Sequence, residues 1–297
     1  MQKKYDIIVP LIFGFIFIAG LSVMFYPTFS DWWNKNMVSH TVSNYKETVA
    51  EIDNSKSEQI LEEAHDYNRK LAELDSPFLE FDKIKGYDDI LNISGTGIMG
   101  YVSIPSINIE LPIYHGTSDG VLRIASGHIQ GSSLPVGGVS THTVISGHRG
   151  LASAKLFTNL DKVVEGDIFT INVLNEVLTY EVEKILIILP DEVDKLAIVP
   201  GDDKVTLMTC TPYGINSHRL LIRAHRIETI FDKKIKVSAD ALQVDRLTVI
   251  PAVFAVFLLF TVIYWSISSR IKHSIRIDKY KVRNLKLQDR EKHGIGS

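Results

Sequence analysis

Two uncharged apolar stretches, residues 7–25 and 247–267, constrain this chain of 297 residues more than any other feature. Each is close to the roughly 20 residues that a helix needs to cross the hydrocarbon core of a bilayer. Both therefore predict membrane-spanning helices. The alternative for the first stretch is a cleaved signal peptide, but its apolar run exceeds the ~7–15 residues usual there and no small-x-small cleavage site follows. A retained anchor is favoured.

Basic residues flank the outer end of each stretch. Lys3 and Lys4 precede the first, and the last 30 residues hold nine basic and three acidic side chains. This pattern places both termini in the cytoplasm, the region between the spans outside a plasma membrane, and the basic tail against anionic lipid. Because the whole chain has a net charge of −3, the middle is acidic, and no nucleic-acid partner is expected.

The segments between the spans differ in their periodicity. Spaced apolar residues among many charges, beginning near Ser30, suit helices that lie against another surface. From Ile98 the pattern changes to short strands separated by Gly and Pro, which indicate an all-β sandwich or barrel. The expected order is a cytoplasmic stub and membrane helix (1–28), an extracellular helical region (29–96), a β domain (97–232), a linker (233–246), a second membrane helix (247–267) and a basic cytoplasmic tail (268–297).

The strand candidates share alternating or β-branched residues between turn signals. Short helices are expected at Leu151–Leu160 and Asp191–Leu196. The expected strands are Met99–Ile104, Ile107–Leu111, Thr143–Ser146, Asp167–Val173, Leu178–Leu189, Val205–Thr209 and Leu220–Ala224.

Three side chains near strand ends supply the parts of an acyl-transfer site. Cys210, the only cysteine, follows a strand and precedes Thr-Pro-Tyr-Gly, and Arg219 begins the next apolar run. An antiparallel hairpin would bring these two to one end of the sheet. His148 follows another strand and has a glycine before it and another two residues later. Together they provide a nucleophile, a proton shuttle and a cation for an oxyanion. Taken singly, each also fits an inert thiol, a solvated charge or a structural imidazole.

Other chemistries have weak support in the sequence. No paired His or Cys spacing typical of a metal site occurs, and no P-loop or Rossmann glycine pattern is present. A single cysteine excludes an internal disulfide framework. Neither a metal nor a cofactor is expected.

The segment Thr206-Leu207-Met208-Thr209-Cys210 resembles the TLxTC motif of sortases, membrane-bound cysteine transpeptidases of Gram-positive bacteria. The resemblance extends from about Met99 to Ile227 and includes Ser-Gly-His-Arg-Gly-Leu at 146–151 and Asn-Ser-His-Arg-Leu-Leu at 216–221. The second apolar span is similar to that of class C, the pilus-assembling sortases. The resemblance implies that Cys210 is the nucleophile, His148 the catalytic histidine and Arg219 the catalytic arginine. It also implies an eight-stranded sortase-type β-barrel preceded by helices and a lid.

Class C lids carry an Asp-Pro-aromatic motif, and Asp75-Ser76-Pro77-Phe78 resembles it with one residue inserted after the aspartate. The resemblance implies that Asp75 lies near the arginine and that Phe78 covers the cysteine, with Pro77 between them. The alternative is a plain turn that ends a helix, because proline cannot continue one.

The implied activity is cleavage of an LPxTG-like sorting signal between Thr and Gly through a thioacyl-enzyme. A lysine of the next pilin would then accept the acyl group, so the expected partners are pilin subunits and membrane lipid. Three alternatives remain open: a housekeeping sortase that attaches proteins to a cell-wall precursor, a non-catalytic scaffold that displays pilins, and a hydrolytic cysteine protease.

Overall fold

The structure is a computed structural model that describes residues 2–151, 153–229, 255 and 258. The predicted linker (233–246), the tail (268–297) and all but two positions of the second predicted span (247–267) lie outside the described residues. The chain divides into two compact units, and residues 26–235 form the unit that holds the β domain.

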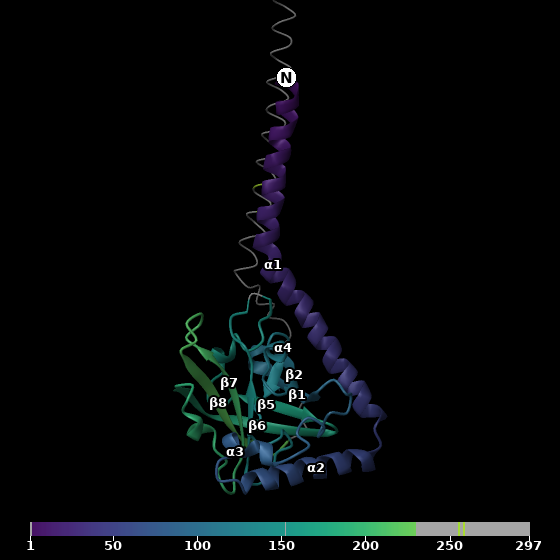
Figure 1. The fold of residues 1–297 in the computed structure, drawn as a ribbon, viewed down its shortest axis with the longest axis vertical. Helices are drawn as coiled ribbons and strands as arrows, with labels where there is room; N and C mark the ends of the chain where they lie inside the picture. The colour runs from purple at the N-terminus through teal and green to yellow at the C-terminus, as the bar shows by residue number, and fades with distance from the viewer. Residues whose placement is uncertain (1, 152, 230–254, 256–257, 259–297) are drawn as a thin grey trace, which may run out of the picture. The chain divides into compact units, whose positions relative to one another are not determined.

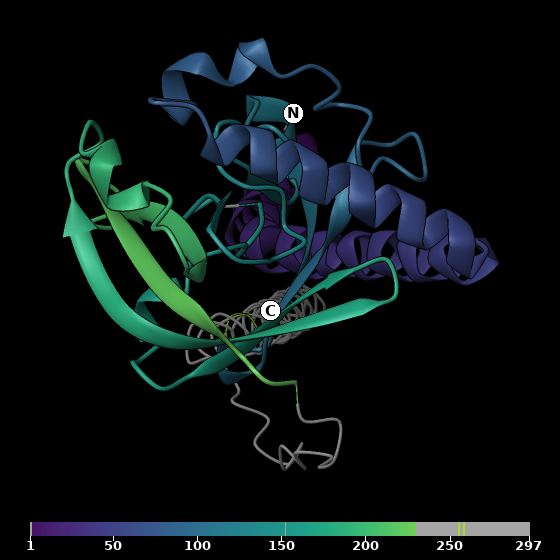
Figure 2. The same ribbon diagram turned by 90° about the horizontal axis from the view of Figure 1, so that it is seen from below.

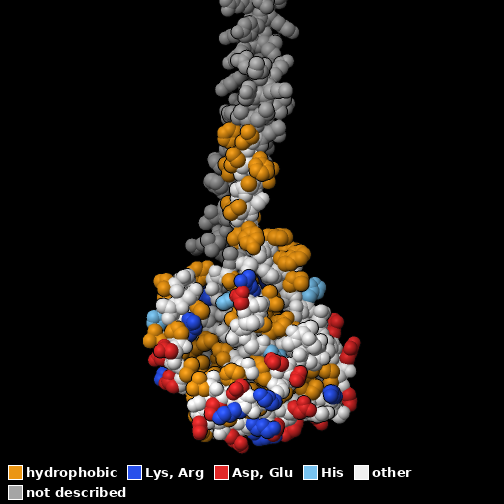
Figure 3. All heavy atoms as spheres, viewed as in Figure 1, with side chains coloured by type: hydrophobic (Ala, Val, Ile, Leu, Met, Phe, Trp, Pro, Cys, Tyr) orange, Lys and Arg blue, Asp and Glu red, His pale blue; other side chains and the backbone are white. Residues whose placement is uncertain are grey.

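Three helices precede the β domain: α1 (Gln2–Glu51), α2 (Asn54–Ala72) and α3 (Pro77–Glu80), followed by a 3-10 turn, η1 (Phe81–Lys83). An 18-residue window in α1 has a mean hydropathy of 1.9 and no buried residue, and its exposed apolar side chains are visible in Figure 3. By length and composition, α1 is the one helix in the described part of the chain that is able to cross a membrane.

Eight strands form a closed barrel in the order β1-β2-β3-β4-β7-β8-β6-β5 (Figures 1 and 2). The predicted β domain is thus confirmed as a barrel. Its strands are β1 (Ile98–Ile104), β2 (Ile109–His115), β3 (Ser126–His128), β4 (Thr141–Ser146), β5 (Ile168–Val173), β6 (Glu176–Ile188), β7 (Asp203–Thr211) and β8 (His218–Ile227). Short helical turns join them: η2 (Pro105–Ile107), α4 (Asp119–Leu122), η3 (Leu160–Lys162) and η4 (Val193–Leu196).

Alternate residues of each strand fill the barrel, because successive side chains point to opposite faces. On β7 and β8 the inward set includes Val205, Leu207 and Ile222, all fully buried in the main core. The same core takes in Tyr67 and Leu71 of α2. The predicted packing of the helical region against another surface is therefore confirmed.

Polar contacts fix the two long helices on the barrel. The Asn68 amide on α2 accepts from the Leu134 N–H at 2.7 Å and donates to the Leu134 carbonyl at 3.1 Å. The Tyr45 hydroxyl on α1 donates to the Met99 carbonyl and accepts from the Leu174 N–H. Burial raises the pKa of Tyr45 to about 12, so this hydroxyl stays protonated at physiological pH.

One local prediction was wrong, and one strand was missed. The expected helix at Leu151–Leu160 is irregular in its described residues, and only Leu160 belongs to a helical turn. Hydrogen bonds with α1, rather than a continuous run of helical hydrogen bonds within the segment, hold its backbone. The three-residue strand β3 was not predicted, since Ser126–His128 is too short to show a period.

Candidate active site

The register of three neighbouring strands brings Cys210, Arg219 and His148 to one edge of the barrel. Cys210 pairs directly with Arg219 in the antiparallel ladder between β7 and β8. β4 runs parallel to β7, and Ser146 pairs with Met208. Continued two residues beyond the end of β4, this register predicts that His148 lies level with Cys210. Carboxyl ends of parallel strands share an edge, so the loop after β4 and the end of β7 meet.

Cys210 and Arg219 belong to the outer face of the sheet, and the alternation of β4 predicts the same face for His148. Val144, Met208 and Leu221 pack together outside the main core. Side chains on one face recur every two residues, so Cys210 shares the face of Met208 and Arg219 shares the face of Leu221. The same count from Val144 leads to His148. Cys210 is therefore half-buried on the barrel wall and not locked inside the core. A thiol in that position can react with a large substrate.

Backbone contacts continue the alignment beyond the end of β4. The Gly147 N–H donates to the Met208 carbonyl at 3.1 Å, and the Thr209 hydroxyl donates to the Gly147 carbonyl at 2.8 Å. A Cβ at position 147 would lie 2.6 Å from Cδ2 of Phe157, so glycine is required for this close approach. The Phe157 N–H then donates to the His148 carbonyl. These contacts place the His148 backbone next to β7.

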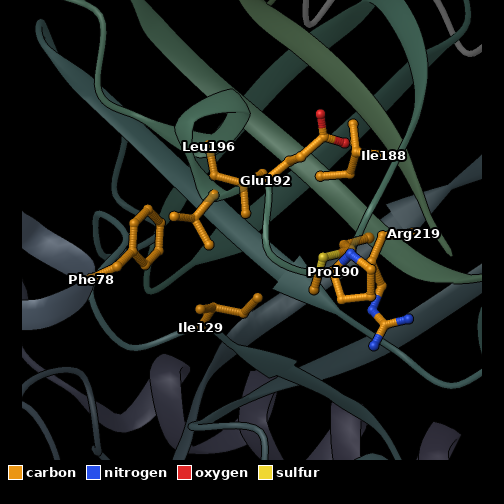
Figure 4. Close-up of a pocket in the computed structure, with 9 residues that line it drawn as sticks. Phe78, Ile129, Ile188, Pro190, Glu192, Leu196 and Arg219 are labelled. Carbon is orange, nitrogen blue, oxygen red and sulfur yellow. The ribbon is translucent and has the colours of Figure 1, made fainter. Parts of the chain in front are cut away.

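Beside the strand ends lies a pocket of about 130 Å³ with mostly apolar walls (Figure 4). In Figure 4, Phe78 and Arg219 lie on opposite sides of it. The Arg219 guanidinium donates through Nη1 to the carbonyls of Asn216 and His218, each at 3.1 Å, which orients the side chain. The pocket is lined by Phe78, Ile129, Ile188, Pro190, Glu192, Val193, Leu196, Met208 and Arg219.

The predicted lid segment thus contributes one residue, Phe78, to the pocket. Phe78 packs against the outer cluster with Ile129 and Met208. Gly131 lies directly beneath it, since a Cβ there would be 2.9 Å from Cα of Phe78. Asp75 is exposed, and within the described residues no ion pair joins it to Arg219; its charge instead helps to raise the pKa of Lys83, after the larger effect of Glu80.

Two other histidines are structural. His128 is fully buried; its Nδ1 accepts from the Tyr87 hydroxyl at 2.9 Å and its Nε2 donates to the Ser133 carbonyl at 2.8 Å. Burial lowers the pKa of His128 to about 4, so the ring stays neutral at physiological pH. Burial likewise lowers the pKa of His142, whose Nδ1 bonds the Ala197 carbonyl. Among the described residues, no group of three or more His, Cys, Asp or Glu is arranged to hold a metal ion.

Sequence reasoning missed several residues that shape the site. Arg149 lies inside a recognised segment and Gly131 lies outside all of them, and no local pattern shows which distant side chains these two residues meet. Met208 and Ile129 read as ordinary strand and loop residues. Their shared outer face follows only from the register of three strands.

Comparison with known proteins matches this barrel and its site to one family. A family model described as the sortase domain matches residues 102–227. The structure of sortase C1 from Streptococcus agalactiae is 44% identical, with a TM-score of 0.59, and covers 64% of this chain and 100% of that one. Sortase C from Clostridium perfringens, solved with the C-terminal cell wall sorting motif, is 41% identical, with a TM-score of 0.57, and covers 64% and 100%.

More distant similarity reaches Sortase A of Streptococcus agalactiae serotype III (strain NEM316), which is 29% identical over 117 residues. That alignment covers 38% of this chain and 47% of the relative, so the chain spans about half of its length. The protein belongs to the sortase family of cysteine transpeptidases, whose members are membrane-anchored at the cell surface. Its structural neighbours are sortases of class C.

Proposed function

We propose that this protein is a pilus-assembling transpeptidase that cleaves an LPxTG-like sorting signal and joins it to a lysine of another pilin. The direct pairing of Cys210 with Arg219 on β7 and β8 carries the proposal. The register of β4 with β7, continued two residues beyond Ser146, brings His148 beside them in this proposal. The 44% identity to a sortase C1 supports class C. The second membrane helix, both cytoplasmic termini and the domain limits (1–28, 29–96, 97–232) belong to the same proposal.

In the first half-reaction, the Cys210 thiolate attacks the carbonyl carbon of the threonine in the sorting signal. A thiolate is the effective nucleophile, and a neighbouring imidazolium favours it over the thiol. Arg219 donates hydrogen bonds to the oxygen that gains negative charge. The bond between Thr and Gly then breaks, His148 gives its proton to the leaving amine, and a thioester joins the signal to Cys210.

In the second half-reaction, an uncharged lysine amine of the next pilin attacks the thioester. His148, now neutral, takes the proton that this amine loses. The new isopeptide bond forms between the threonine carbonyl and the lysine nitrogen, and Cys210 leaves as a thiolate beside the imidazolium. The site returns to its starting state with no cofactor.

Phe78 supports a lid over this site. It occupies one side of the pocket that Arg219 borders, and it is carried by a four-residue helix, α3, none of whose residues is fully buried. A short segment with no fully buried residue has few contacts to lose on opening. Pro77 begins α3 and Asp75 lies two residues before it, exposed. In this proposal Phe78 leaves when the sorting signal enters, and Asp75 does not pair with Arg219.

A housekeeping sortase is the second candidate, because the similarity to Sortase A extends over 117 residues. The acceptor distinguishes the two. The full chain in detergent is incubated with a sorting-signal peptide and either a lysine-bearing pilin domain or an oligopeptide amine of the cell-wall type. Mass spectrometry should find an isopeptide bond to lysine, absent with Cys210→Ala. Products with the oligopeptide alone would favour the second candidate, and hydrolysis alone would favour a protease.

A further inference from the structure

We propose that Arg149 is a positioning residue that ties the loop carrying His148 to the strand end carrying Cys210. This inference rests on the proposed function of those two groups. Arg149 follows His148 directly in the sequence, so any displacement of its backbone is transmitted to His148 through one peptide bond.

The Arg149 guanidinium contacts three side chains in two segments, η3 and the end of β7 with the loop that follows it. Nη2 forms an ion pair and a hydrogen bond with Asp161 in η3, and Nη1 donates to the Thr211 hydroxyl at 3.5 Å. The guanidinium carbon also lies 5.9 Å from the centre of the Tyr213 ring. Thr211 is the residue after Cys210, and Tyr213 lies in the loop between β7 and β8. One side chain therefore links the His148 loop to the last residue of β7 and to the loop that follows it.

The Arg149 side chain is more buried than is usual for an arginine near the protein surface. The Arg149 side chain is 10% exposed, whereas its partner Asp161 is 42% exposed. Its Nε is buried and has no hydrogen-bond partner among the residues that the structure describes. An ion pair with one exposed partner and an unsatisfied buried donor is a poor source of stability. The placement is better explained by the fixed geometry that a planar guanidinium imposes on its partners.

A backbone contact links the same two segments independently. Gly150 has a φ of +78°, and a Cβ there would lie 2.8 Å from Cε2 of Tyr213. The loop thus rests directly on the tyrosine ring. The Gly150 N–H donates to the Thr158 hydroxyl at 3.1 Å, which closes the turn. Arg149 and Gly150 together fix the spacing between the loop and the end of β7.

The expected consequence concerns chemistry and not substrate binding. The catalytic rate depends strongly on the positions of the catalytic groups, because a misplacement of about 1 Å can lower a rate by roughly 100-fold. Without the guanidinium, His148 would no longer stay level with Cys210. Turnover should fall, and Cys210 should react more slowly with an alkylating reagent, because the thiolate loses part of its stabilisation by the imidazolium.

The test uses the full chain in detergent with the variants Arg149→Ala, Arg149→Lys and Tyr213→Ala. Tyr213 is 60% exposed, so its replacement should spare the fold. Two quantities are measured: kcat and KM for a sorting-signal peptide, and the rate of Cys210 alkylation by iodoacetamide against pH. We expect Arg149→Ala to lower kcat about tenfold or more with little change in KM, Arg149→Lys to recover little of the loss, and Tyr213→Ala to act in the same direction with a smaller effect.

Arg123→Ala is the matched control, because Arg123 forms an exposed ion pair with Asp119. It should leave both quantities unchanged. An unchanged kcat and alkylation profile in folded Arg149→Lys and Tyr213→Ala would overturn the inference, even if Arg149→Ala does not fold. If the unmodified protein fails to cleave the peptide while Arg149→Lys still shifts its alkylation profile, the inference stands and the proposed substrate is wrong.

Discussion

Cys210 and Arg219 are held by a backbone ladder, whereas His148 lies in a loop held by side-chain contacts and a few backbone hydrogen bonds. Nine-residue and ten-residue strands fix the first two residues, which face each other as a register pair. His148 lies two residues beyond the end of β4. Its neighbours are fixed by Gly147 against Phe157, by the Arg149 contacts and by hydrogen bonds from α1. Substitutions away from the three central residues should therefore affect the histidine far more than the thiol or the guanidinium.

The largest predicted effect tests the strand-held pair. Arg219→Lys keeps the charge and the strand, but an ammonium cannot reproduce the two-pronged donor geometry of a guanidinium. Loss of one oxyanion donor typically lowers kcat by about 100-fold or more. Steady-state cleavage of a sorting-signal peptide should show that loss with an unchanged melting temperature. Near-normal turnover would remove Arg219 from the mechanism.

The dependence of stability on pH tests the barrel wall, because His128 lies in strand β3. The pKa of His128 falls from 6.5 to about 4 on folding because the ring is buried. Between these values the unfolded chain binds a proton that the folded chain does not, so stability is full above pH 6.5 and falls as the pH decreases toward 4. The slope should approach about 1.4 kcal/mol per pH unit, and His142 should add to it in the same direction.

Thermal melts between pH 7 and pH 5 check this expectation. His128→Asn should flatten the dependence, whatever its effect on stability at pH 7. His40→Asn is the control, since His40 is exposed on α1. A slope that is equal in all three proteins would show that His128 is not the group that titrates.

A smaller effect tests the contacts between the loop and α1. The Ser30 hydroxyl and the Asn34 amide both donate to the Ser153 carbonyl, and Asp31 accepts from the Lys155 N–H at 3.0 Å. A net hydrogen bond contributes about 0.5–1.5 kcal/mol. The double variant Ser30→Ala/Asn34→Ala should therefore lower kcat by about two- to tenfold in the full chain.

The control for that variant is Thr41→Ala, whose hydroxyl bonds the Met37 carbonyl within α1. Unchanged turnover in the double variant, with the control also unchanged, would mean that α1 does not hold the histidine loop. The contacts of Arg149 and Gly147 would then be the ones that hold the loop carrying His148.

The smallest predicted effect concerns the lid. Phe78→Ala should increase the rate at which a thiol reagent labels Cys210, because the ring borders the pocket that leads toward Arg219. Leu79→Ala is the control, since Leu79 is 83% exposed beside it. Equal labelling rates in the two variants would show that α3 is a helix-ending turn and not a lid.

Local sequence patterns predicted an all-β sandwich or barrel and the hairpin that carries Cys210 and Arg219, whereas the eight-stranded barrel was predicted from the resemblance to sortases. Strand alternation and the Thr-Pro-Tyr-Gly turn are local signals, and they predicted that Cys210 and Arg219 lie at the same end of the sheet. The structure confirms this and pairs the two residues directly. The helix expected at Leu151–Leu160 failed because contacts with α1 and the Phe157 packing override local propensity there. The role of Asp75 was inferred from a motif with an inserted residue, and it lies exposed.

Other features depend on contacts between distant segments. Nothing near Arg149 in the sequence shows that it meets Asp161 and Thr211, and nothing near Gly131 shows that it underlies Phe78. A buried guanidinium and a glycine beneath an aromatic ring become visible only in three dimensions.

The alignment of His148 with Cys210 can be tested directly, because the chain has a single cysteine. In the variant His148→Cys, adjacent parallel strands would place the two Cα atoms about 4.8 Å apart, within the range of roughly 4.4–6.8 Å that a disulfide accepts. Mild oxidation should join the two thiols, as read by intact mass and loss of labelling, whereas Lys46→Cys on α1 should leave both thiols free. Two free thiols in folded, oxidised His148→Cys would contradict the alignment on which the mechanism depends.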